Sequence, residues 1–333
     1  MTVDPSLLSP EPDRMGIGLL ERNRTLLARA TRVLRAAANF EWVAAADDPQ
    51  RLRAALAEDT RLVACEGGDL DLLLGWTELS RARFAAWSHD AGRLVAAAAK
   101  DDRVVSLIGW PSYQSMPRPW EMALATKTIL WAQPEPVSIK DILTGAPVVA
   151  DFLPQRDSDR ASVIASIAAL SERAGAAERI SARIGEVAHE LVVNASYDAP
   201  VDKAGEQRYA HDRKKPITLA PNEVPHVQFA TDGMYVIVQV SDRFGRLTRE
   251  HVLASIQRGM AASSAAANDV VDSSNGGAGL GLWRVYTSSA VTIVDVLPGH
   301  SSTVTAVFDL DIGARDARAL PPSLHLFDRS RLG

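Results

Sequence analysis

The chain has 333 residues, of which 47% are hydrophobic and 23% charged, a balance typical of a globular protein long enough for two domains. Its net charge of -5 gives no electrostatic basis for nucleic-acid binding, so we expect no nucleic-acid partner. One cysteine excludes an intramolecular disulfide framework, no apolar run is long enough to cross a membrane, and the acidic N-terminus does not read as a signal peptide. We therefore expect a cytoplasmic protein without membrane insertion.

Residues 15–132 contain short apolar runs that alternate with amphipathic segments. The runs expected as strands are 17–20, 40–44, 62–65 and 104–108, and the segments expected as helices include 26–37 and 49–57. Strands that alternate with helices predict an α/β domain with a parallel sheet. The first strand, followed by Glu21-Arg22-Asn23 and an Arg- and Leu-rich helix, resembles a response-regulator receiver domain.

The receiver resemblance implies a site that this sequence does not complete. In a receiver the phosphoacceptor aspartate ends the third strand, where this chain has Cys65 and Glu66. Glu21 and Arg22 stand in place of the acidic pair that binds magnesium. The resemblance therefore implies a pseudo-receiver that serves binding or dimerisation without phosphorylation. An unrelated small α/β domain is the alternative.

Residues 133–178 are predicted to be a linker followed by a helical segment. Pro134 and Pro136 mark the linker. Apolar residues from Val163 to Leu170 then recur at helical spacing, and Gly175 is expected to end the helix.

A second helix is predicted over residues 180–195, where apolar positions recur at spacings of four, three, four and four. Glu190 and Asn194 lie one turn apart on this helix and project side by side. A carboxylate can orient a water or take a proton, and an amide oxygen can ligate magnesium. Two unrelated polar residues on a solvated face are the alternative.

A β-rich run over residues 234–242 ends in Asp242, and Gly245 follows it. A carboxylate at the end of a buried strand suits the adenine amino group, which is a hydrogen-bond donor. An aspartate that merely begins a turn is the alternative.

The glycine-rich turn before the apolar segment 282–286 contains Gly277, Gly279 and Gly281. Glycine amides can approach a polyphosphate without a side chain in the way, and a helix that begins there adds its positive end. The turn is not a Walker-type motif, because Leu282 and Trp283 stand where the lysine and hydroxyl would be expected.

These three motifs, in this order, resemble those of the GHKL superfamily of ATP-binding domains, shared by histidine kinases, anti-sigma-factor serine kinases, DNA gyrase and MutL. The resemblance covers about residues 180–310 and implies an α+β sandwich of the Bergerat type that binds ATP and Mg²⁺. It implies Glu190 as the base or water-orienting residue, Asn194 as the magnesium ligand, and residues from about 246 to 276 as a lid. The other implied nucleotide contacts are Asp242, Gly245, Gly277, Gly279, Leu280, Gly281 and Thr303.

The sequence departs from the family in ways that bear on function. Phe244 stands where the second motif has its first glycine, and Tyr197 where many histidine kinases carry a basic residue. The helical segment before residue 180 has no histidine, and His189 adjoins Glu190 on the ATP-binding helix, which disfavours autophosphorylation on histidine.

We therefore expect a signal-transduction protein that phosphorylates a partner or hydrolyses ATP, with a non-catalytic, ATP-gated interaction module as the alternative. The implied partners are ATP, a signalling protein and, as a further possibility, a second copy of the chain. The predicted organisation is a receiver-like domain at 15–132, a linker and helical segment at 133–178, the ATP-binding domain at 179–312 and a tail at 313–333. Within the ATP-binding domain, residues 291–297 and 303–310 are expected to form a hairpin around Pro298-Gly299-His300.

Overall fold

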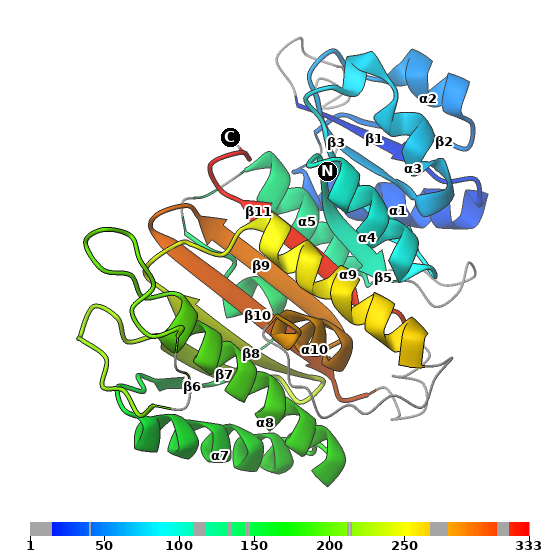
Figure 1. Cartoon of the computed structure of the whole chain (residues 1–333). Coiled ribbons are helices and arrows are strands. Elements are labelled where there is room, and N and C mark those ends of the chain that lie inside the picture. The colour runs from blue at the N-terminus through cyan, green and yellow to red at the C-terminus, as the bar shows by residue number, and fades with distance from the viewer. Residues whose placement is uncertain are drawn as a thin grey trace. The chain divides into compact units, whose positions relative to one another are not determined.

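The computed structural model describes residues 15–39, 41–109, 118–131, 133, 135–143, 145, 147–211, 213, 215–266, 279–311 and 320–332. The chain divides into two compact units, residues 1–133 with 332–333, and residues 134–331. In each unit helices pack on a β-sheet (Figure 1), which confirms the α/β character expected from the sequence.

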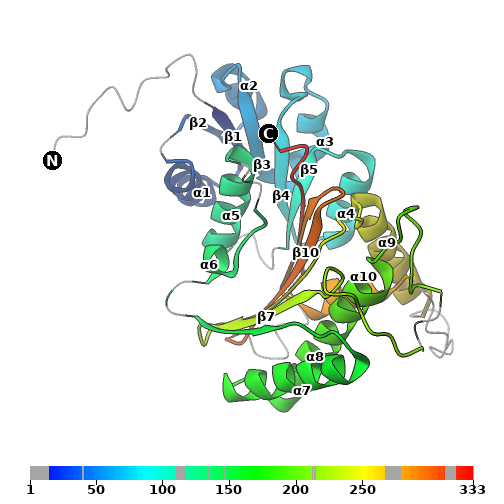
Figure 2. The same ribbon diagram turned by 90° about the vertical axis from the view of Figure 1, so that its left-hand side faces the viewer.

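The first unit is a parallel sheet whose strands lie in the order β2-β1-β3-β4-β5. Helices α1 and α5 pack together on one face and α3 and α4 on the other (Figure 2). The order 2-1-3-4-5 is that of flavodoxin-like doubly wound folds. Its elements are β1 (Gly16–Leu20), α1 (Arg24–Ala37), β2 (Val43–Ala46), α2 (Pro49–Ala55), β3 (Thr60–Glu66), α3 (Gly67–Leu74), a 3₁₀ turn (Thr77–Leu79), β4 (Arg83–Ser88), α4 (Ala91–Lys100), β5 (Val104–Gly109) and α5 (Pro119–Leu130).

Helices cover both faces of this sheet, and all six residues of β5 are buried. The sequences of such strands are continuous apolar runs, without the alternation of polar and apolar residues seen in half-exposed strands. Side chains cap several helices: Asn23 accepts the first free amides of α1, and Asp48 those of α2. Strand β4 and its neighbours α3 and α4 were not predicted. The reason is local, because β4 begins with a charged residue and contains the two weak strand formers Ala85 and Ala86.

The second unit has a mixed sheet of six strands in the order β11-β9-β10-β8-β7-β6. All neighbouring strands are antiparallel except β11 and β9, which are parallel. Its elements are α6 (Ile139–Ile142), β6 (Val148–Phe152), α7 (Asp157–Arg173), α8 (Glu178–Val193), a π-helical turn (Asn194–Asp198), β7 (His226–Thr231), β8 (Tyr235–Asp242), α9 (Arg249–Ala266), α10 (Gly281–Ser288), β9 (Val291–Leu297), β10 (Ser301–Asp309) and β11 (Ser323–Asp328).

Helices α8 and α10 lie directly on one face of this sheet, with α7 against α8 and α9 against α10 (Figure 1). Because side chains alternate along a strand, Val240 of β8 faces α8 whereas Gln239 points to the opposite face. There the Gln239 amide donates to the Val137 carbonyl, at 3.0 Å, and to the Thr305 hydroxyl, at 2.8 Å. The alternation decides which residues of β8 and β10 can reach a ligand beneath the helices.

Several predicted elements are present where the sequence placed them. The helix expected over 180–195 is α8, and the helix before it, α7, stops ahead of Gly175, whose positive φ of 96° suits a helix end. The hairpin is also confirmed, with β9 and β10 joined around residues 298–300.

Two stretches outside the predicted ATP-binding domain belong, over residues 134–178 and 313–331, to the same compact unit as that domain. Residues 133–178, taken as a linker and helix, contribute β6 at the sheet edge and α7 against α8. The predicted tail, 313–333, contributes β11, and Arg329 after it forms a buried ion pair with Asp295 of β9. Neither strand was expected, because five or six residues of moderate hydropathy predict a strand only weakly until a paired neighbour is known.

None of the helices in the described ranges combines the length and the apolar composition that a bilayer crossing requires.

Candidate functional site

Glu190 lies on α8, against the start of α10, and Asn194 is the C-cap residue that directly follows the helix. The buried stripe of α8, which includes Val187 and Leu191, packs the helix on the sheet. At Asn194 the helix widens into the π-helical turn, closed by a hydrogen bond from the Ala199 amide to the Asn194 carbonyl at 3.2 Å. Such turns occur frequently at functional sites, because the widened turn changes the direction of its side chains.

Asp242 ends β8 as a buried acceptor, with 8% of its surface exposed. Its Oδ1 atom accepts hydrogen bonds from the amides of Phe244, at 2.8 Å, and Gly245, at 3.2 Å. Ser302 lies opposite in the β8–β10 register and also hydrogen-bonds to the carboxylate. Burial raises the pKa of Asp242, and these hydrogen bonds oppose that rise.

A cavity of about 610 Å³ lies between α8, α9, the start of α10 and the ends of β8 and β10. It brings together five predicted residues that are far apart in the sequence: Glu190, Asn194, Asp242, Gly279 and Gly281. Leu191, Val240 and Val304 supply apolar wall. The cavity therefore combines an apolar part with several polar groups, as small-molecule sites do.

The start of α10 contacts Glu190 because residue 281 is glycine. A Cβ atom on Gly281 would lie 1.7 Å from Oε1 of Glu190, so the carboxylate occupies the space that a side chain would fill. Gly279 has φ +108°, and its carbonyl accepts hydrogen bonds from the Ser255 hydroxyl, at 2.6 Å, and from Arg258, at 3.1 Å. Ser255 and Arg258 both belong to α9, so these hydrogen bonds join α9 to the glycine turn.

The structure describes only some of the other residues predicted for the glycine motif and the lid. Gly277 lies outside the described residues. Leu280 caps α10 and is not among the residues that line the cavity. Within the predicted lid, 249–266 form helix α9, and 267–278 lie outside the described residues.

Thr303, which the resemblance assigned to adenine recognition, is not among the residues that line the cavity. Its hydroxyl lies 2.8 Å from that of Ser241, on the sheet face opposite the helices. The β10 residues that line the cavity are its neighbours, Ser302 and Val304. A shift of one residue along a strand moves a side chain to the other face, and motif spacing alone did not fix that register.

Gly245 also lies outside the cavity wall, and its role is in packing. It has φ +60°, and a Cβ atom there would lie 2.3 Å from the Leu297 carbonyl oxygen and 2.7 Å from the Gly299 amide nitrogen. The Asp242–Gly245 turn is therefore pressed against the backbone of the β9–β10 turn. Phe244, beside it, is likewise absent from the cavity wall.

Gly245→Ala is expected to lower the free energy of unfolding by roughly 3 kcal/mol, because it adds a clash with three backbone atoms to the strain of a positive φ. Urea denaturation measures this loss. Gly233→Ala is the matched control: Gly233 has φ +89° but nothing within 4 Å of its missing Cβ, so only the strain of about 1 kcal/mol should appear. Equal losses in the two variants would contradict the packing role.

Basic side chains that the sequence analysis did not assign to the site also line the cavity. They are Arg213, Arg246, His251 and Arg258. Arg213 is ion-paired with Asp198, a carboxyl whose pKa is raised by burial. Guanidinium groups at a cavity wall suit a polyanionic ligand, since they form charge-assisted hydrogen bonds to phosphate oxygens.

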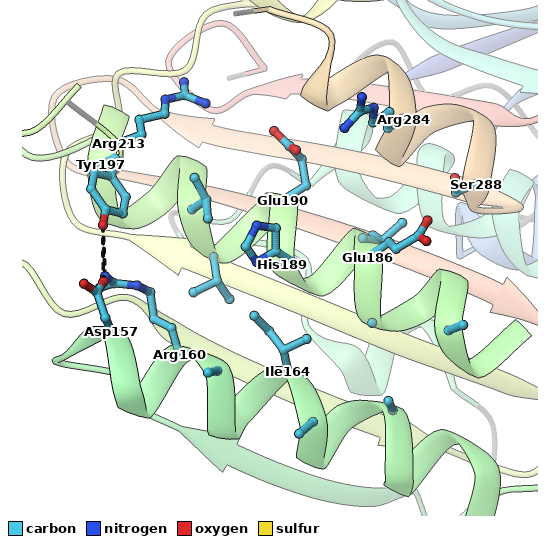
Figure 3. A pocket seen from close by; sticks show the side chains of 18 residues that line it. Asp157, Arg160, Ile164, Glu186, His189, Glu190, Tyr197, Arg213, Arg284 and Ser288 are labelled. Carbon is cyan, nitrogen blue, oxygen red and sulfur yellow. Dashed lines mark hydrogen bonds and ion pairs between the residues drawn. The ribbon is translucent and has the colours of Figure 1, made fainter. Parts of the chain in front are cut away.

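A second, more open cavity of about 1360 Å³ runs between α7 and α8 (Figure 3). Small and apolar side chains such as Ile164 line it, and Tyr197 lies at one end, with its hydroxyl 3.1 Å from Arg160 and 3.2 Å from Asp157. Tyr197 is thus buried in a polar cluster. This groove and the first cavity share two lining residues, Glu190 and Arg213, so Glu190 can be approached from both.

In the first unit, the acidic side chains at the ends of β1 and β3 are occupied by bonds within the chain. Glu21 accepts from the Asn23 amide, at 2.8 Å, and from the Trp87 indole, at 3.2 Å. Burial raises the pKa of Glu21.

The two neighbouring acids are similarly engaged. Arg22 holds Asp69 through two hydrogen bonds of 3.0 and 2.6 Å, and Glu66 accepts from the amide at the start of α3. In the described ranges, no group of three or more His, Cys, Asp and Glu side chains is arranged to hold a metal ion.

Comparisons with known proteins add little to this geometry. No family model and no curated protein matches the chain. Among solved structures, it is similar to a chain of the SiaB–SiaC complex from Pseudomonas aeruginosa, with 15% identity and a TM-score of 0.34. The match covers 48% of this chain and 88% of that one. At this level the likeness supports no assignment of function, which has to rest on the site.

Proposed function

We propose that the second unit binds magnesium-ATP as a GHKL-type domain, and that the protein acts in signalling as an ATP-dependent protein kinase or ATPase. The observation that supports this proposal is the convergence of Glu190, Asn194, Asp242, Gly279 and Gly281 on one cavity. The volume of about 610 Å³ falls within the range of small-molecule sites.

The adenine ring is assigned to the Asp242 end of the cavity. A buried carboxylate, already oriented by two backbone amides, accepts a hydrogen bond from the adenine amino group. Ser302, and not Thr303, is the neighbouring hydroxyl on this face of the sheet. Val240 and Val304 provide apolar surface for the ring.

The phosphates are assigned to the glycine turn and the arginines. Gly279 and Gly281 stand at the start of α10, whose positive end favours phosphate, and Arg246 and Arg258 lie in the same wall. Asn194 offers its amide oxygen as a magnesium ligand. Bound magnesium would neutralise charge on the phosphates.

Glu190 is assigned the role of general base. Its carboxylate takes the proton of a partner's serine or threonine hydroxyl, or of a water, as the oxygen attacks the γ-phosphorus and ADP leaves. The groove between α7 and α8 supports this assignment, because it gives an acceptor access to Glu190 from outside the nucleotide cavity.

The first unit is proposed to be a pseudo-receiver that acts by binding. The strand order 2-1-3-4-5 is compatible with a receiver fold. Glu66 stands in the phosphoacceptor position, and both it and Glu21 are already hydrogen-bonded within the chain.

The alternative function, a non-catalytic module in which ATP controls partner binding, is favoured by one observation. The resemblance to the GHKL family implies that Gly245 contacts the nucleotide. Here Gly245 packs against the β9–β10 turn and does not line the cavity. Both functions require ATP to bind in the same cavity.

Isothermal titration with ATP, with and without magnesium, tests the shared claim. Asn194→Ala is expected to remove most of the gain in affinity that magnesium gives the wild type, roughly tenfold, and to leave metal-free ATP binding unchanged. Val193→Ala, at the next position on the same helix, is the control because Val193 lines only the second cavity. A magnesium effect that persists in Asn194→Ala would remove Asn194 from the site.

A further inference from the structure

Strand β6 is the last strand of the second unit's sheet, and no described strand pairs with its outer edge (Figure 1). The edge is unusually apolar for an exposed one: Val148 is 60% exposed, Val149 42% and Leu153 67%. Of the five large hydrophobic side chains that are exposed in the described ranges, these are three. Met234 is a fourth, and it lies in the β7–β8 turn that begins beside Val148.

The usual protections of a sheet edge are weak here. Natural edges carry lysine, proline or a bulge, which prevent pairing with another chain. Strand β6 has a regular register with β7 and a single charge, Asp151, and the nearest prolines, Pro147 and Pro154, lie outside the strand at its two ends. That carboxylate is held by its own sheet, at 2.8 Å from His226 and 2.7 Å from Gln228.

We propose that β6 pairs antiparallel with β6 of a second copy of the chain, about a twofold axis at Ala150, so that one sheet continues through a homodimer. The proposal is independent of nucleotide binding. It commits to a second copy because the strand is self-complementary in this register. Val148 then faces Phe152 of the partner subunit on the helix side, and Val149 faces Asp151 of the partner subunit on the other side.

Other registers fit less well. The twofold axis is perpendicular to the sheet, so the helices of both copies lie on the same face. Each residue must then lie opposite a partner residue on the same face, and this is possible only when the axis passes beside a residue. A centre at Asp151 places two carboxylates directly opposite each other, which is destabilising. A centre at Val149 leaves Phe152 without a partner within the strand.

A charge pair at position 149 tests the register. Val149→Glu places a carboxylate opposite Asp151 of the partner subunit, and the twofold axis repeats this pair of like charges. The variant is therefore expected to weaken dimerisation roughly tenfold. Val149→Lys puts an opposite charge there and is expected to keep or strengthen the dimer. Leu72→Glu, at an exposed leucine of the first unit, is the control and should leave dimerisation unchanged.

Sedimentation equilibrium of the full-length chain measures these constants. A five-residue edge gives a small interface, so the wild-type dimer is expected to dissociate in roughly the micromolar range. A wild-type chain that is monomeric throughout that range overturns the proposal. Equal weakening by glutamate and lysine at position 149 overturns the register, because loss of apolar contact alone predicts that result.

A disulfide provides a second, independent readout. The twofold axis brings the two Ala150 Cα atoms to about 4.5–5.5 Å, within disulfide range, so Ala150→Cys is expected to cross-link under mild oxidation. The native Cys65 is fully buried and should not compete. Leu72→Cys is the control for random collision, and cross-linking of both variants to the same extent contradicts pairing at β6.

Discussion

Replacing Glu190 by glutamine is expected to lower ATP turnover at least about a hundredfold and to leave ATP affinity within about twofold of the wild type. General-base catalysis contributes on the order of 10²–10⁴ to a rate, and glutamine keeps the shape of the side chain but cannot take the proton. Because Glu190 fills the space above Gly281, a similar shape also preserves the start of α10. Phosphate release and transfer to candidate partner proteins measure turnover, and isothermal titration measures affinity.

The matched control for Glu190→Gln is Glu186→Gln. Glu186 lies one turn earlier on the same helix, is exposed and lines the second cavity but not the first. Its substitution should leave hydrolysis unchanged. A wild-type protein that binds ATP but neither hydrolyses nor transfers phosphate would favour the ATP-gated module and remove the kinase or ATPase assignment.

Asp242→Ala is expected to lower ATP affinity about a hundredfold, the second large effect. Without the Asp242 carboxylate, the adenine amino group would be buried with no hydrogen-bond acceptor, and an unpaired buried polar group costs much of the binding free energy. Isothermal titration with ATP measures the change, and circular dichroism checks that the fold is intact.

Two β10 variants decide which hydroxyl belongs to this site. Thr303→Val, on the opposite face of the sheet, should leave ATP affinity unchanged, whereas Ser302→Ala should reduce it by a smaller factor than Asp242→Ala. If Thr303→Val weakens ATP binding and Ser302→Ala does not, the register of the adenine site is wrong.

Local patterns in the sequence predicted the elements that hold the candidate site. The 3.6-residue period around Glu190 and Asn194 requires one buried helix face, and this period alone places both side chains on one side of the helix. Asp242 at the end of an apolar run was predicted at the end of a strand for a similar reason. The parallel sheet of the first unit was also predictable, because its doubly covered strands are continuous apolar runs.

Contacts between distant segments could not be read from such patterns. Arg258 joins the site because α9 packs against the glycine turn, and no local signal marks an arginine as a neighbour of Gly279. Gly245 was assigned to the ligand through the resemblance of the Asp242–Gly245 motif to the GHKL family, but its missing Cβ is required by the backbone of a turn more than 50 residues later.

By itself, the sequence determined which side chains share a helix face or end a strand, since these properties depend on residues within one or two turns of each other. Only the tertiary structure decided that Ser302 and not Thr303 faces the cavity, and that β6 and β11 complete the sheet. The physical reason is that strand register and edge pairing are set by partners far along the chain, and a shift of one residue reverses every side chain. The exposed edge of β6, where a second copy is proposed to bind, is likewise visible only once the sheet is assembled.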